Sequence, residues 1–205
     1  MPRHAFSFPD KVRNAVRDYV NDRRQSVSPQ RFKQEPPYVA ALAQSLAGVA
    51  YDGPEATVKF ETTAVDDRGP GSAEKWSGAD LVITAEISDG KKVVRKAILL
   101  QAKRGHIDEL SPKEKGKLVA SIEKMRQLTR SPKVLELGDD ADRHPAVLSG
   151  NGILNGGSPH SYDLPDYLVR RVLTTMDGDT RPDFVENVQE SGLANLKVYA
   201  RKKGP

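Results

Sequence analysis

The chain contains Gly78-Ala79-Asp80-Leu81-Val82-Ile83 and, after a turn, Ala97-Ile98-Leu99-Leu100-Gln101-Ala102-Lys103. The apolar part of each stretch is typical of a strand, and the Asp89-Gly90 pair between them is a strong hairpin signal. We therefore predict antiparallel strands over residues 81–87 and 93–102. The second strand is apolar at consecutive positions, which indicates a central strand covered on both faces. This hairpin brings Asp80, Gln101 and Lys103 together at one end of the two strands.

The rest of the sequence predicts an α/β fold around this hairpin. Apolar residues at helical spacing predict helices over 9–25, 36–50 and 164–176, and a further helix that begins at Ser111-Pro112. Strands are expected over 57–65, 134–137, 146–148 and 196–200, with loops over 66–78 and 151–157. The order is helix, three strands, helix, strand, which predicts a mixed sheet flanked by helices.

The length of 205 residues suits a single domain that covers the whole chain, 1–205. Within it we expect a basic helical extension over 1–33, a core over 35–150 and a C-terminal completion over 151–205. Hydrophobic residues make up 37% of the chain and charged residues 29%, and these are values of a globular protein.

The absence of cysteine limits the chemistry that the chain can perform. Without it there are no disulfides, zinc–thiolate sites, iron–sulfur clusters or cysteine nucleophiles. The four histidines show no metal-ligand spacing. Any metal is therefore expected to be held by oxygen ligands, which favours Mg²⁺, with Mn²⁺ as a substitute.

Positive charge is concentrated around and after the second strand of the hairpin. Residues 91–133 contain 13 Lys and Arg against four Asp and Glu. A basic block next to a metal site favours a phosphate-containing partner, although solvated helix faces also account for many lysine-rich stretches. We expect DNA contacts from Arg104, Lys113 and Lys117, and from Arg17 in the basic N-terminal helix.

The residues at the hairpin's end match the needs of phosphodiester hydrolysis. Side chains alternate along a strand, so Gln101 and Lys103 share a face. Asp80 offers a hard carboxylate, Gln101 an amide oxygen and Ala102 a backbone carbonyl, while Lys103 is placed to position water or stabilise the phosphoryl group. A bound Mg²⁺ lowers the pKa of its water and withdraws charge from phosphorus.

These residues resemble the PD-(D/E)xK nuclease superfamily, whose pattern is an acid at one strand and an acid or Gln, any residue and Lys on the next. Gly78-Ala79-Asp80 with Gln101-Ala102-Lys103-Arg104 is most similar to the Mrr-like restriction branch. The resemblance implies a restriction-endonuclease-like core with α-β-β-β-α-β order. It also implies Asp80 as metal ligand, Gln101 as secondary ligand and Lys103 as catalytic lysine.

The superfamily often adds a glutamate to the metal site. Here Glu35, just before the helix predicted at 36–50, is one candidate, and Glu61 on the preceding strand is the other. The resemblance further implies an endonuclease that cuts double-stranded DNA as a homodimer. It would act in prokaryotic restriction or antiviral defence, with other subunits of such a system as possible partners.

Two alternatives to a DNA nuclease stay open. One is a module that keeps the nuclease fold but only binds nucleic acid or a protein, because Gln101 leaves the metal one negative charge fewer. The other is an RNA-directed nuclease, since basic charge does not separate RNA from DNA.

Three further features complete the expectations. No apolar run reaches membrane-spanning length and no signal-peptide pattern opens the chain, so we expect a cytoplasmic protein without membrane contact. Trp76, the sole tryptophan, is expected to pack over the sheet end rather than stack on a base. His106 is expected in a loop without a catalytic role.

Overall fold

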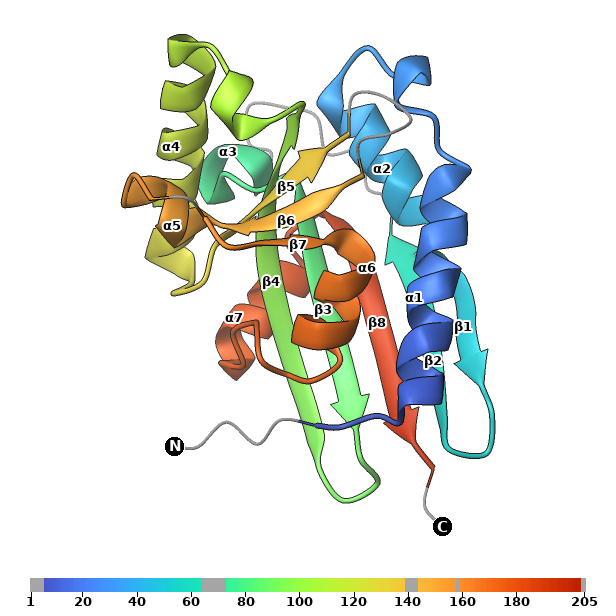
Figure 1. The fold of residues 1–205 in the computed structure, drawn as a ribbon. Helices are drawn as coiled ribbons and strands as arrows, with labels where there is room; N and C mark the ends of the chain where they lie inside the picture. Colours follow the sequence, from blue (N-terminus) through green and yellow to red (C-terminus); the bar gives the residue numbers. More distant parts are fainter. Residues whose placement is uncertain (1–5, 64–72, 139–143, 158, 204–205) are drawn as a thin grey trace.

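The computed structural model describes residues 6–63, 73–138, 144–157 and 159–203 (Figure 1). Its centre is one mixed sheet of eight strands in the order β1-β2-β8-β3-β4-β5-β6-β7. The strands of the described residues are β1 (Gly48–Asp52), β2 (Ala56–Thr63), β3 (Leu81–Ser88), β4 (Val93–Arg104), β5 (Lys133–Leu137), β6 (Ala146–Ser149), β7 (Ser161–Asp163) and β8 (Ala194–Lys202). The expected α/β class with a mixed sheet is therefore confirmed.

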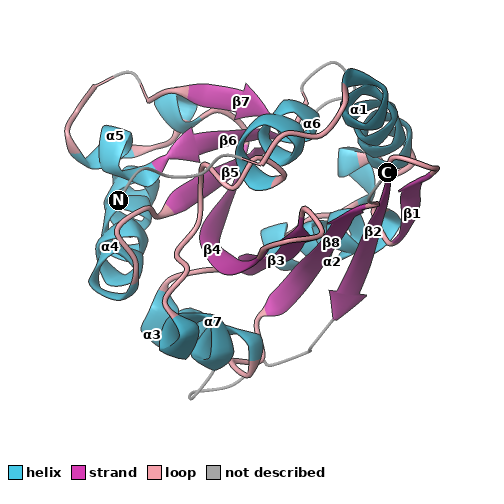
Figure 2. Ribbon diagram, turned by 90° about the horizontal axis from the view of Figure 1, so that it is seen from below, coloured by secondary structure: helices cyan, strands magenta, loops and turns pink. Residues whose placement is uncertain are grey.

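Helices cover both faces of this sheet, so the fold has three layers. They are α1 (Asp10–Gln25), η1 (Pro29–Arg31), α2 (Glu35–Ser45), α3 (Ala73–Ser77), η2 (Ile107–Glu109), α4 (Pro112–Leu128), α5 (Gly150–Leu154), α6 (Leu164–Tyr167), the π-helical turn η3 (Leu168–Val172) and α7 (Pro182–Gln189). Figure 2 shows α1 and α6 on one side of the sheet and α3 and α7 on the other. Two buried apolar clusters fill the spaces between the layers.

The alternation of side chains along β4 explains why there are two cores. Ile98, Leu100 and Ala102 belong to the cluster under α1, α2 and α6, whereas Leu99 belongs to the cluster under α4 and α7. Ile98, Leu99 and Leu100 are at most 1% exposed. The expectation of a central strand covered on both faces is correct, and it places Gln101 on the α4 side.

The β3–β4 hairpin forms as predicted. Leu81 pairs with Leu100 and Ser88 with Val93. In the turn, Gly90 has φ +89°, and the Asp89 carboxylate accepts hydrogen bonds from the backbone N of Lys91 (2.9 Å) and Lys92 (2.8 Å). The glycine supplies the left-handed conformation, and the aspartate closes the turn, which fixes the register of the whole hairpin.

The helix predicted to begin at Ser111-Pro112 is also confirmed. The Ser111 hydroxyl accepts from the backbone N of Glu114, and the Glu114 carboxylate accepts from the backbone N of Ser111, which is a complete capping box. Pro112 occupies the first turn, where its missing N–H costs nothing. Leu118, Ile122 and Met125 form the buried stripe.

Some predicted boundaries and elements are wrong. The helix expected over 36–50 ends at Ser45, because Gly48 takes φ +139° and starts β1, where Val49 and Tyr51 suit a strand. The loop expected over 151–157 begins with the short helix α5, which Ser149 caps through the backbone N of Gly152 (3.3 Å). The loop expected over 66–78 lies partly outside the described residues, and its later part contains α3.

Other elements went unrecognised or end early. Regular helix from Leu164 gives way to the π-helical turn and stops at Val172 rather than Met176. Helix α7 was not predicted, although Pro182 at its first turn and the buried Phe184, Val185 and Val188 are a helical signal. The short strand β7 was also missed.

The parts of the chain that were expected to be peripheral contribute to the centre of the fold. Val12, Val16 and Val20 of α1 are fully buried, so the described part of the region 1–33 contributes to the core rather than being appended to it. Strand β8 lies between β2 and β3, antiparallel to the first and parallel to the second. The expected core of 35–150 therefore omits a central strand.

Among the described residues, no helix combines the length and the apolar character that crossing a membrane requires.

Candidate active site

Asp80 lies at the start of β3, where its carboxylate meets the end of β4. Its backbone N donates to the carbonyl of Leu100 (2.9 Å), which extends the antiparallel ladder. Its Oδ2 accepts from the backbone N of Ala102 (2.7 Å) and from Nε2 of Gln101. The Asp80 carboxylate is thus held against β4, the strand that carries Gln101 and Lys103.

The approach to Asp80 depends on Gly78. This residue has φ +73°, and a Cβ at its position would lie 2.5 Å from the backbone O of Ser121 in α4. Only glycine accommodates both the left-handed conformation and this close contact. Gly78 therefore lets the chain pass against α4 and enter β3 with Asp80 in place.

Gln101 is 5% exposed and connects two of the predicted metal-binding oxygens. Its Nε2 donates to Asp80 Oδ2 and also to the carbonyl of Ala102 (3.1 Å). One amide nitrogen thus occupies the space between two hard oxygen ligands. The oxygen and nitrogen ends of a glutamine amide exchange places by a half-turn about its last torsion angle.

Lys103 points to the same face as Gln101 and forms an ion pair with Glu35. The Lys103 Nζ to Glu35 Oε2 distance is 2.8 Å, and the two side chains are 17% and 29% exposed. Glu35 Oε1 also accepts from the backbone N of Arg104 (3.1 Å). Glu35 stands in the first turn of α2, where the helix dipole favours a negative charge.

The contact with Lys103 distinguishes Glu35 from its competitor. Glu61 on β2 forms a 2.6 Å ion pair with Lys59 instead, and both side chains are about half exposed. Glu35 comes from a helix on one face of the sheet, and Gln101 and Lys103 point to the other. Glu35 and Lys103 nevertheless meet at the end of β4, where the Glu35 carboxylate also accepts from the backbone N of Arg104.

Glu136 is a member of this region that the sequence did not reveal. It stands opposite Lys103 in the parallel β4–β5 pair and is 13% exposed. Its Oε1 accepts from the backbone N of Ile107 (2.7 Å), and its Oε2 lies 3.5 Å from His106 Nδ1. The sequence does contain a signal for it, because Glu136 is the one acidic residue of β5 and lies between two leucines. His106 stands before η2, as a loop residue, with Glu136 as its partner.

The four residues predicted to contact DNA differ in their surroundings. Lys113 and Lys117 are exposed on α4. The Arg104 guanidinium donates instead to the carbonyls of Phe32 and Pro29, so it holds the turn that precedes α2 and Glu35. Arg17 donates to Asp166 (2.8 Å) and Asn14 (2.8 Å), and thereby joins α1 to α6.

The donor set suits a hard divalent cation, with one condition. Asp80, Ala102 and Glu35 supply carboxylate and carbonyl oxygens of the kind that Mg²⁺ prefers. No cluster of three or more His, Asp or Glu side chains arranged for a metal occurs in the described ranges. Metal binding here requires the Gln101 amide to turn, so that Oε1 replaces Nε2 between the other oxygens.

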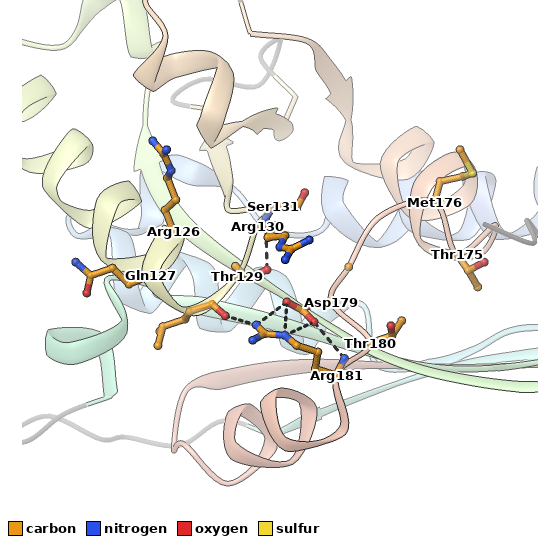
Figure 3. A pocket seen from close by; sticks show the side chains of 12 residues that line it. Arg126, Gln127, Thr129, Arg130, Ser131, Thr175, Met176, Asp179, Thr180 and Arg181 are labelled. Carbon is orange, nitrogen blue, oxygen red and sulfur yellow. Dashed lines mark hydrogen bonds and ion pairs between the residues drawn. The ribbon is translucent and has the colours of Figure 1, made fainter. Parts of the chain in front are cut away.

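A cavity of about 630 Å³ opens elsewhere, at the C-terminal end of α4 (Figure 3). It is lined by Arg126, Arg130 and Arg181 among others, and it does not include Asp80, Gln101 or Lys103. Arg181 is neutralised there by Asp179, at 2.8 Å. The predicted site residues lie instead at the β3–β4 end, where Asp80 accepts from Gln101 and Lys103 pairs with Glu35.

Comparisons with known proteins add no relative to this picture. No family model, no curated protein sequence and no solved structure matches the chain.

Proposed function

We propose that the chain is a Mg²⁺-dependent endonuclease that hydrolyses double-stranded DNA, with a restriction-endonuclease-like core formed by α2, β2, β3, β4, α4 and β5. The observation that carries the proposal is the convergence of Asp80, Gln101, Lys103 and Glu35 at the end of β4. The sheet departs from the expected core at three points: β1 is added at one edge, β6 and β7 are added at the other, and β8 separates β2 from β3.

Each residue has a defined task in this proposal. Asp80, the Ala102 carbonyl and Oε1 of a turned Gln101 hold the cation, with Glu35 as a further carboxylate. A bound Mg²⁺ supplies an activated water and withdraws charge from the phosphoryl group. Lys103 presents its ammonium to the phosphoryl oxygens. Glu35 positions that ammonium: its carboxylate accepts from Lys103 Nζ and is itself held by the backbone N of Arg104. A site of this kind cuts one strand, so a double-strand break requires two copies, and we propose a homodimer.

The direct test is plasmid nicking with Mg²⁺, with Mn²⁺ and with EDTA, comparing Lys103→Ala with wild type. We expect nicking only with metal, and a loss of about 10²- to 10³-fold in the variant, as when one electrostatic donor to a developing charge is removed. The matched control is Lys92→Ala. Lys92 is exposed at the other end of β4, roughly 36 Å away for eleven residues of strand. Equal loss in both variants, or nicking that resists EDTA, would refute the assignment.

The binding module is the second candidate, and the Gln101 amide is the specific observation that favours it. In its present orientation this amide satisfies the oxygens that a metal needs. In such a module, Nε2 of Gln101 binds the Asp80 and Ala102 oxygens in the place that a cation takes in a nuclease.

Gln101→Glu separates the two candidates. A glutamate adds a negative charge and removes the competing donor, so we expect Mn²⁺ to bind at least about tenfold more tightly by calorimetry, or about 1.4 kcal/mol. Gln127→Glu, at an exposed position of α4, is the control and should leave Mn²⁺ affinity unchanged. If wild type binds no Mn²⁺ and only Gln101→Glu does, the binding module is the better account. If neither binds, there is no metal site at this position.

A further inference from the structure

Trp76 stands out on the surface next to the candidate active site. It is 48% exposed, although it is the largest apolar side chain and the only tryptophan in the chain. The other exposed large apolar residues of the described chain are Val49, Val93 and Tyr199. Val93 begins β4 at the end opposite Gln101 and Lys103, and Val49 and Tyr199 lie on β1 and β8. About half of the Trp76 side chain is therefore left uncovered, although the sequence predicted packing over the sheet end.

The short helix that carries Trp76 is fixed against α4. Gly78 lies against the Ser121 backbone so closely that no Cβ fits between them. Lys124 Nζ donates to the carbonyl of Lys75 (2.8 Å), directly before Trp76. These two contacts on either side of Trp76 hold its backbone in place beside α4.

Three exposed lysines lie along one face of α4, the helix against which the Trp76 backbone is held. Lys113, Lys117 and Lys124 are exposed and are spaced by four and seven residues, so they share one helix face. Ser121, which touches Gly78, lies one turn from Lys117 along the same side. At Gly116 a side chain would meet nothing within 4 Å, so the surface between the first two lysines is open.

The chain itself connects this surface to the candidate active site, because Asp80 follows Trp76 by only four residues. Lys103 lies towards the start of α4: hydrogen bonds from Ser111 lower the pKa of the Glu114 carboxyl, and the charges of Lys103 and Lys117 lower it further. Helix α3 and the glycine that follows it contact α4 more than two turns further on, at Lys124 and Ser121.

We propose that Trp76 and the cationic face of α4 (Lys113, Lys117 and Lys124) bind DNA that carries an unpaired base, with that base stacked on the indole ring. This deepens the proposed nuclease and rests on it for the position of the cut. A chain of four residues spans at most about 14 Å. At 3.4 Å per nucleotide along a strand, the stacked base would lie within about four nucleotides of the scissile phosphate.

The base must be unpaired because an aromatic ring stacks only on an uncovered base face. In an intact duplex each face is covered by its neighbours, whereas a bulged or extruded base offers a free one. Lysines alone bind phosphate without this preference. The combination of an exposed indole, carried on a backbone held against α4, with three lysines therefore selects a duplex with a local unpaired site.

The test is a titration in EDTA, so that binding is read without cleavage. The probes are a DNA hairpin closed by a non-nucleotide linker with one bulged thymine in its stem, the same hairpin with a fully paired stem, and inorganic polyphosphate. We expect Trp76 fluorescence to be quenched by the first hairpin only, which should also bind about fivefold or more tightly than the paired one, corresponding to about 1 kcal/mol of stacking. Quenching by polyphosphate, or equal affinity for both hairpins, would overturn the inference.

Variants measured by anisotropy of labelled hairpins sharpen this test. Trp76→Ala should lose the preference for the unpaired base, Trp76→Phe should keep part of it, and Tyr199→Ala, the matched exposed aromatic, should leave it unchanged. Lys113→Ala and Lys117→Ala should weaken binding to both hairpins and each reduce the salt slope by about one. A preference that survives Trp76→Ala refutes the stacking role even if cleavage occurs. A preference that is lost in Trp76→Ala supports it even if no metal-dependent cleavage is found.

Discussion

Asp80→Asn is expected to abolish metal-dependent cleavage, with a loss of about 10³-fold or more, and to remove Mn²⁺ binding. The substitution deletes the charge that the cation needs and keeps nearly the same shape. The asparagine oxygen can still accept from the Ala102 backbone N, so the strand end keeps its main hydrogen bond. We therefore expect a cost in unfolding free energy of only about 1 kcal/mol, the value of an ordinary hydrogen bond.

Three measurements on one preparation decide this prediction: plasmid nicking, Mn²⁺ calorimetry and urea unfolding. Asp18→Asn, on the exposed side of α1, is the matched control and should change none of them. Cleavage that persists in Asp80→Asn would place the active site elsewhere. Lost cleavage with unchanged Mn²⁺ affinity would show that Asp80 is not the ligand.

Lys96→Met is expected to cost about 3–5 kcal/mol of unfolding free energy, because three carbonyls lose their donor and each buried unpaired group costs about 1–3 kcal/mol. Lys96 is 1% exposed inside the sheet. Its Nζ donates to the carbonyls of Arg171 (3.3 Å), Val172 (2.8 Å) and Asp177 (2.6 Å). Two of these carbonyls lie at the π-helical turn, where regular helical hydrogen bonding ends, so the lysine supplies the donor that the helix lacks.

Urea unfolding measures this cost, with Lys92→Met as the control at an exposed position. A loss below about 1 kcal/mol for Lys96→Met would show that the carbonyls find other donors. The neighbouring cations Arg171 and Lys133 are both paired with the Asp177 carboxylate (2.8 Å and 3.0 Å), which accepts hydrogen bonds rather than donating them.

The same residue makes stability depend on pH in a defined direction. Burial lowers the pKa of Lys96 from 10.5 to about 7, against the opposing charge of Asp177. Between these values the unfolded chain binds a proton that the folded chain has released. The unfolding free energy contributed by Lys96 therefore rises as pH increases from about 7 towards 10.5. Urea unfolding at pH 6, 8 and 9.5 should show this rise in wild type, and the rise should be smaller in Lys96→Met.

The sequence predicted the hairpin and its polar end because both depend on local rules. The Asp89-Gly90 turn fixes the register, and alternation along a strand then places Gln101 and Lys103 on one face. It also predicted the start of α4, since a capping box is a contact between residues three apart. The hydrogen bonds of Asp80 to Gln101 and Ala102 follow from that register.

What the sequence could not decide depends on contacts between distant segments. The choice between Glu35 and Glu61 rests on how α2 meets the end of β4, 68 residues away from Glu35. The isolated Lys96 in an apolar strand signals a buried partner, but the partner carbonyls come from a helix end more than 70 residues later. Arg104 and Arg17 look like phosphate ligands by charge, and only tertiary packing shows the partners that hold them.

The central position of β8 affects how the protein is made. Strands β1 to β7 all precede β8 in the chain, yet β8 pairs with both β2 and β3. During synthesis, the sheet therefore cannot be completed until residues 194–202 have left the ribosome. Until then β1–β2 and β3–β7 are two separate pieces, each with an open edge where β8 belongs. Such long-range pairing folds slowly, and open edges favour aggregation. A nascent or truncated chain without β8 would be a target for chaperones and proteases before it could act on any substrate.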